Sequence, residues 1–381
     1  MTIVEHETEQ RLAYFPSADT RSLRAAVRSW VSGNTGGAAS VAQRLGDAPW
    51  DRAMWTSIAG GLGVGQLLLP EELGGLAAGY EDYAASLEEL GRGLLATPVL
   101  GSLGYGLGAL LPLAAAGGPA AELAEQVAEG HIVVAVAATG LDGSWGAQRP
   151  TATRADDGHV VDGVSGLVVD APRADVLLVF AEERGVLGLY RVDASAADVQ
   201  QRASLDPSRA VADVVFAGAL GQRLADGDVA RRSLDHTRQL ARLAVAAESV
   251  GGAQSALDEA VRYALARHQF GKPIAAFQAV KHMCADALLA IQEAKAVLAY
   301  ATWALDDGSP EAERALLAAK ISATDAYVAS AARAVQVFGA MGTTREVSVQ
   351  VHFRRARFLS LILGSNDTDR ETLADQLGLS A

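Results

Sequence analysis

The spacing of hydrophobic residues changes twice along this chain of 381 residues. Up to about residue 125, apolar residues recur with helical spacing, as in 80–91, where Tyr83, Leu87 and Leu90 share one face. Between residues 131 and 216, short runs rich in β-branched residues alternate with Gly, Asp and Pro, which is typical of strands and turns. From residue 226 the helical spacing returns and continues to the end. This order predicts an α+β protein with a small β domain between two helical ones.

The pattern sets expected limits for these parts. We predict an N-terminal helical domain over 1–125, a middle β barrel or sandwich over 126–222, and a C-terminal helical bundle over 223–381. For the last helix of the bundle, Thr343 and Glu346 have the spacing of a capping box. The expected strands cover 132–136, 151–154, 159–164, 167–169, 176–181, 188–192 and 212–216, and the expected bundle helices cover 229–266, 277–306, 310–338 and 343–361.

Composition excludes several classes of protein. The net charge of −13 and the absence of a basic stripe argue against nucleic acid or an anionic membrane as a partner. A single cysteine, Cys284, excludes an internal disulfide and a Cys-rich metal site, so we expect no metal. The polar N-terminus has no signal-peptide pattern, and the longest apolar runs are too short for a membrane span. We therefore expect a soluble, cytoplasmic protein.

One stretch, residues 267–278, gathers cationic, amide and aromatic side chains around a glycine and a proline. Arg267 offers a planar fork of donors that suits a phosphate or pyrophosphate. Phe270 and Phe277 offer flat faces to an aromatic ring, and the amide of Gln278 can contact a base edge. The stretch is also compatible with an ordinary connection between two helices.

Together with three further segments, this stretch resembles the acyl-CoA dehydrogenase family over nearly the whole chain. The segments are 69–75 (LPEELGG), 87–92 (LEELGR), 267–274 (RHQFGKPI), 277–278 (FQ) and 336–342 (QVFGAMG). The resemblance implies FAD as cofactor, with its adenosine and pyrophosphate held by this chain and its ring in a neighbouring subunit. It assigns the pyrophosphate to Arg267 and the adenosine to Phe277 and Gln278. It further implies contacts with FAD from Gln269, Phe270, Gln336, Gly339 and Gly342. The segment 336–342 is also compatible with a plain interhelical turn.

The carboxylate that the family's reaction needs is missing. A base must remove the α-proton of the thioester while the flavin accepts a hydride from the β-carbon. The family's usual glutamate position corresponds to Leu363, and the alternative position on the first bundle helix corresponds to Ala241. Glu248, on the same helix, is a weak substitute that we expect to be structural or interfacial.

The β domain also departs from the family, because it lacks residues that would face the flavin ring. The loop that would face the flavin ring reads TGLDGS over 139–144, and the strand that usually carries an aromatic reads LVVD over 167–170. Thr139 and Ser144 keep hydrogen-bonding groups, but the Glu-Pro turn and the stacking aromatic are absent. Segments that reach a neighbour's flavin are therefore retained, whereas those serving the chain's own flavin are eroded.

This contrast leads to a hypothesis. The chain is expected to be the non-catalytic subunit of an α2β2 heterotetramer that completes the FAD site of a glutamate-bearing partner. Segments 354–365 and 205–209 (LDPSR) resemble paired actinobacterial dehydrogenases that act on CoA thioesters of steroid side chains, such as that of cholesterol. The resemblance also implies an electron-transferring flavoprotein as acceptor. Two alternatives stay open: a homotetrameric dehydrogenase with a displaced base such as Glu248, and a homologue without a redox role.

Overall fold

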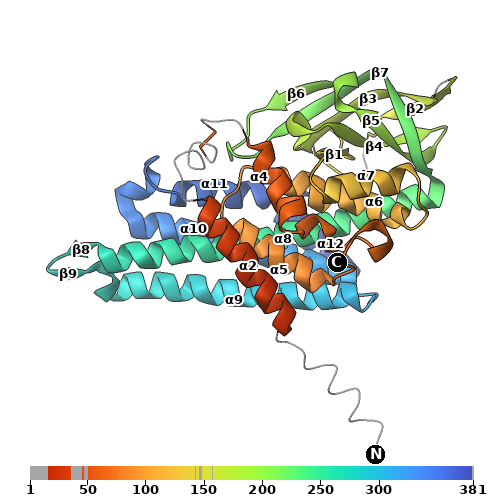
Figure 1. The fold of residues 1–381 in the computed structure, drawn as a ribbon. Coiled ribbons are helices and arrows are strands. Elements are labelled where there is room, and N and C mark those ends of the chain that lie inside the picture. The colour runs from red at the N-terminus through yellow and green to blue at the C-terminus, as the bar shows by residue number, and fades with distance from the viewer. Residues whose placement is uncertain are drawn as a thin grey trace, which may run out of the picture.

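The computed structural model of the chain describes residues 16–35, 45–46, 50–141, 143–145, 148–156 and 158–379. In this part the order of elements is helical, then β, then helical (Figure 1). The predicted fold class is therefore confirmed. No helix within the described ranges combines the length and the apolar character that crossing a bilayer requires.

The N-terminal helices pack around aromatic and aliphatic side chains such as Trp55, Ile58 and Leu103, which are fully buried. Asp51 caps the second of these helices, because its carboxylate accepts a hydrogen bond from Ala53 N at 2.8 Å. The helices are α2 (Ala18–Asn34), α4 (Arg52–Thr56) with a π-helical continuation (Ser57–Gly61), α5 (Tyr80–Gly91), a π-helical segment (Leu100–Gly106) leading into α6 (Leu107–Ala114), and α7 (Pro119–Ala128).

The middle strands form one mixed sheet of seven strands. They are β1 (Val134–Ala137), β2 (Thr151–Ala155), β3 (Gly158–Val169), β4 (Val176–Glu183), β5 (Val186–Asp193), β6 (Asp198–Arg202) and β7 (Val211–Asp226). The order is β1-β4-β2-β3-β7-β5, and β4 also pairs with β5, so the sheet closes on itself as a small barrel.

Two details of the sheet differ from the predicted strands. The segments 159–164 and 167–169 belong to one strand, β3, whose pairing with β7 shifts register between Ser165 and Val168. Strand β6 was not predicted, because its sequence DVQQR is polar and it is bound only along the edge of β7. Backbone pairing, which leaves no hydrophobic pattern, decides both features.

The C-terminal helices are α8 (Gly227–Ala266), α9 (Gln278–Asp306), α10 (Ala312–Phe338), α11 (Val349–Leu359) and α12 (Asn366–Gln376). The capping box predicted at Thr343 and Glu346 was wrong. Residues 339–343 form a 3₁₀ turn in which the Thr343 hydroxyl donates to Ala340 O at 2.9 Å, and the helix begins only at Val349. The Thr343 hydroxyl therefore belongs to the turn that follows α10 and does not cap the start of α11.

Helix α8 runs through the centre of the molecule, between the N-terminal helices and the other bundle helices (Figure 1). Its glycines permit this position: a Cβ at Gly251 would lie 1.7 Å from Glu88 O on α5. One hydrophobic cluster includes residues from the N-terminal helices, the sheet and the bundle. The three parts consequently share a core, and a cavity remains where the sheet meets the bundle.

Candidate functional site

This cavity measures about 790 Å³ and lies between the sheet, α8 and the α11–α12 connection. A volume of this size suits a drug-sized ligand or part of a cofactor. Most of its wall is apolar and includes Val136, Leu167, Val169, Phe358 and Leu363. The charged side chains in the wall are Arg202, Arg238, Arg242 and Asp369.

Three of these four charges are already paired. Arg202 binds Asp213 through two nitrogens, one at 2.7 Å, and Arg242 is ion-paired with Glu313. Asp369 accepts from Lys320 Nζ at 2.5 Å. Among the described residues of the wall, no carboxylate is left free to accept a proton.

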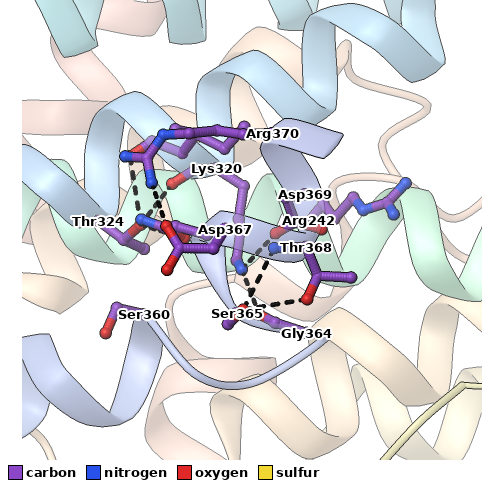
Figure 2. A network of polar contacts seen from close by, with 12 residues as sticks. Arg242, Lys320, Thr324, Ser360, Gly364, Ser365, Asp367, Thr368, Asp369 and Arg370 are labelled. Carbon is purple, nitrogen blue, oxygen red and sulfur yellow. Dashed lines mark hydrogen bonds and ion pairs between the residues drawn. The ribbon is translucent and has the colours of Figure 1, made fainter. Parts of the chain in front are cut away.

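Lys320 also fixes the loop that carries Leu363. Its ammonium is fully buried and donates to Gly364 O at 2.7 Å as well as to Asp369 (Figure 2). Burial lowers the pKa of Lys320, and Asp369 partly offsets that effect. Asn366, two residues after Gly364, donates to Thr324 at 2.8 Å and to Asp325 at 2.7 Å. The loop is therefore held rigidly against α10.

The two positions that correspond to the family's base differ in their placement. Leu363 lines the cavity with a left-handed backbone (φ 63°). Ala241 is fully buried in the core, near Gly104, and is not part of the cavity wall. The cavity-facing residues of α8 are instead Arg238 and Arg242, on either side of Ala241. Counting along the chain could not give this rotation of the helix.

Glu248 belongs to a different environment, a buried ion cluster. Arg209 and Arg355 both bind its carboxylate, the latter from Nη1 at 2.5 Å. Burial alone would raise the pKa of Glu248, but the charges of the two arginines outweigh it and hold the pKa below its ordinary value. A carboxylate stabilised in its charged form is a poor proton acceptor, so the geometry favours a structural role.

The β-domain loop over 139–144 lines the cavity with Thr139, Gly143 and Ser144. The Thr139 hydroxyl donates to Gly166 O, and the Ser165 hydroxyl donates to Thr139 O at 2.8 Å, so these groups hold the loop to β3. Asp142 lies outside the described residues. Sequence reasoning found no aromatic here, yet Trp145 lines the cavity and stacks on Tyr105 with ring centroids 5.7 Å apart. Only the folded loop brings Trp145 to this wall.

The stretch 267–278 forms a hairpin at the end of α8. Strands β8 (His268–Gln269) and β9 (Lys272–Pro273) are joined by Phe270 and Gly271, whose φ angles are 53° and 76°. Both angles are positive, as in the type I′ turns of two-residue hairpins, which suits Gly271 but strains Phe270. This hairpin lies at the end of the bundle remote from the sheet (Figure 1).

The side chains of the hairpin face solvent. Phe270 is 90% exposed and meets Phe277 edge to face, with centroids 6.1 Å apart. The ammonium of Lys272 lies 4.6 Å from the centroid of the Phe277 ring. Arg267, Gln269 and Gln278 are exposed. These groups present a cationic and aromatic surface at the tip of the bundle.

The segment 336–342 lies beside this tip. Phe338 stacks on Tyr263, one turn before Arg267, with centroids 4.1 Å apart. Gln336 and Gly339 are exposed, whereas Gly342 is buried and has no room for a side chain, since a Cβ would lie 2.7 Å from Val335 O. The structure therefore places 336–342 at the same end of the bundle as the hairpin.

The arrangement matches known proteins in sequence and in fold. The N-terminal domain model of the acyl-CoA dehydrogenases matches residues 17–124, and their C-terminal domain model matches 227–378. The acyl-CoA dehydrogenase IpdE2 of Mycobacterium tuberculosis (strain ATCC 25618 / H37Rv) is 30% identical over 351 residues, which cover 92% of this chain and 94% of that protein. The chain belongs to the acyl-CoA dehydrogenase family.

Solved structures agree on the fold. PigA with FAD and proline has a TM-score of 0.86 at 23% identity and covers 97% of this chain and 100% of its own. A variant of the Tcur3481–Tcur3483 steroid ACAD has a TM-score of 0.81 at 25% identity and covers 94% of this chain and 98% of its own.

Proposed function

We propose that this chain is the non-catalytic subunit of a heteromeric FAD-dependent acyl-CoA dehydrogenase. It would complete the flavin site of a partner from the same family that carries the glutamate. The observation that carries the proposal is the wall of the cavity, where Leu363 stands at the base position and the one carboxylate among the described lining residues, Asp369, is bound to Lys320.

The residues of the hairpin fit the part of FAD that a partner would present. A diphosphate needs donors that are not already used, and no side-chain hydrogen bond of Arg267 is seen within the described ranges. An adenine ring needs an apolar face and an amide, which the half-buried Phe277 and the exposed Gln278 provide. Gln269, Phe270, Gln336, Gly339 and Gly342 would surround the same group.

The proposal separates two tasks in space. When bound, FAD accepts the hydride from the β-carbon of the thioester. This chain would bind and orient its adenosine half from the bundle tip, while a carboxylate of the partner removes the α-proton. The tip lies at the end of the bundle remote from the sheet (Figure 1), so the proposal assigns it to the partner's FAD.

Steroid CoA thioesters are the substrate class that we propose. One structure of similar fold is a steroid ACAD, and segments 205–209 and 354–365 resemble the paired actinobacterial dehydrogenases. In this chain Asp206, Ser208 and Arg355 from those two segments bind one another. The electrons would pass to an electron-transferring flavoprotein, as the resemblance implies.

Co-expression tests the proposal. The chain is purified alone and together with the family member encoded beside it, and flavin is counted per chain by absorbance. We expect a complex of both chains with half as many flavins as chains and turnover of a steroid side-chain CoA thioester. If the chain alone forms a yellow homotetramer whose flavin is reduced by substrate, the proposal is contradicted and a displaced base is favoured. A co-expressed complex without flavin would favour a scaffold role.

A further inference from the structure

The cavity beside Leu363 combines an apolar wall with cationic side chains, as ligand sites do, although it lacks the base of the family. Its charged residues are all paired within the described part of the chain except one, Arg238 on α8. No hydrogen bond or ion pair of the Arg238 guanidinium is seen among the described residues, and its Nε is buried without a partner. The side chain as a whole is half-buried, and a buried donor without a partner is costly for a folded protein unless something binds it.

Arg238 is held in place without using its donors. Its guanidinium lies over the ring of Trp145, 6.0 Å from the centroid, and Trp145 in turn stacks on Tyr105. A cation above an aromatic face is stabilised by the ring while its N–H edges stay available. The stack therefore positions the guanidinium at the cavity wall.

The neighbouring charges do not neutralise it. Arg242, the next cavity-facing residue of α8, already binds Glu313, and Asp369 is bound to Lys320. Burial lowers the pKa of Arg238 most, the positive charges of Arg242 and Arg149 lower it further, and the charges of Glu313 and Asp235 raise it. An incoming anion would remove this unfavourable state.

We propose that the cavity binds a small molecule with an apolar body and a single carboxylate, and that Arg238 recognises the carboxylate. The apolar wall, with Leu167, Phe358 and Leu363, would cover the body of the ligand. One unpaired guanidinium matches one negative charge, whereas a phosphate dianion would leave a second charge without compensation. This site goes beyond the proposed function, because it does not involve the hairpin or the partner's flavin.

Binding to the full-length protein tests the site with decanoate as the probe. Decanol has the same body without the carboxylate and serves as the matched ligand. Titration calorimetry gives both affinities. Ligand binding should also change the tryptophan fluorescence of the protein, which has five tryptophans. Loss of this change in Trp145→Phe would locate the ligand beside Trp145. We expect decanoate to bind roughly tenfold or more tightly than decanol, the difference that a charged hydrogen bond supplies.

Variants of α8 assign the preference to Arg238. Arg238→Gln should remove the difference between the two ligands, and Arg238→Lys should keep part of it because the charge remains. Arg232→Gln is the control, since Arg232 is an exposed arginine of the same helix outside the cavity. Thermal melting verifies that each variant is folded.

Three results would overturn the site. These are equal affinity for decanoate and decanol, the absence of saturable binding, and a preference for decanoate that survives in Arg238→Gln. The flavin count of the co-expressed complex is a separate measurement, so a failure of this site would not be confused with a failure of the proposed function.

Discussion

Arg355 on α11 donates a hydrogen bond from Nη1 to Oε1 of Glu248 on α8 at 2.5 Å, and the Arg355 side chain is 1% exposed. The same guanidinium binds Asp206, the Ser208 hydroxyl at 2.6 Å and Leu95 O at 3.1 Å. One side chain thus joins the bundle, the loop before β7 and the segment that follows α5. The partners satisfy the buried charge, which would otherwise be strongly unfavourable.

The cluster predicts that Glu248→Gln destabilises the protein rather than removing a catalytic group. Arg355 and Arg209 would lose the negative charge between them, and breaking a buried ion pair costs about 3 to 5 kcal/mol. Urea unfolding followed by far-UV circular dichroism measures the loss of free energy of unfolding. Loss of turnover in a complex whose unfolding curve is unchanged would instead identify Glu248 as a base.

Acidification should reveal the same cluster. The pKa values of Asp206 and Glu248 are lowered in the folded protein, because the arginine charges outweigh the effect of burial. Their contribution to stability is present above the ordinary values, 3.8 and 4.5, and is lost as the pH falls below them. Wild-type protein should therefore lose more stability than Glu248→Gln as the pH falls from about 5 to about 3.

Asp170 acts with the opposite sign. Burial raises its pKa most and the negative charge of Glu248 raises it further, so the opposing contribution of Asp170 is smaller in Glu248→Gln. Parallel curves of stability against pH for wild type and variant would contradict the assignment.

Arg267→Ala is expected to lower the flavin content of the co-expressed complex. The exposed guanidinium would no longer pair with the diphosphate, and a charged hydrogen bond is worth roughly a factor of ten or more in affinity. Arg267→Lys should recover only part of the affinity because it lacks the planar fork. Flavin released by denaturation is quantified by absorbance against protein mass.

Arg231→Ala is the matched control for this experiment, since Arg231 is exposed at the opposite end of α8. Equal flavin content in wild type, Arg267→Ala and Arg231→Ala would exclude the hairpin from the flavin site.

Lys320→Met should destabilise the protein by about 3 to 5 kcal/mol, because Asp369 and the carbonyl of Gly364 lose their buried partner. The double variant Lys320→Met with Asp369→Leu should be less destabilised than Lys320→Met alone, since it leaves no buried charge. A double-mutant cycle by urea unfolding measures the coupling. Additive losses would show that the two side chains do not stabilise one another.

Much of the fold followed from the sequence because it depends on local spacing. The 3.6-residue period placed α5, α8, α9 and α10 to within a few residues of their observed ends. Alternation and turn residues placed most strands. Strand β6 and the start of α11 could not be found in this way, since edge pairing and a 3₁₀ turn decide them. The domain limits stay a prediction, because one hydrophobic cluster spans all three parts.

The candidate sites divide in the same way. Segments 267–278 and 336–342 were recognised as motifs because each is continuous in the chain, and their roles toward FAD stay a prediction. The residues at 205–209 and Arg355 were noticed only as a resemblance, whereas the structure gives them a physical role in one buried ion cluster.

By itself, the sequence determined the order of helices and strands, the family resemblance and the absence of a carboxylate at Leu363 and Ala241. These depend on residue identity and on spacing along the chain. Only the tertiary structure decided that Glu248 is bound by two arginines, that Trp145 and Arg238 share a cavity wall, and that the hairpin lies at the end of the bundle remote from the sheet. Such relationships depend on the rotation of a helix and on contacts between distant segments, which no local pattern encodes.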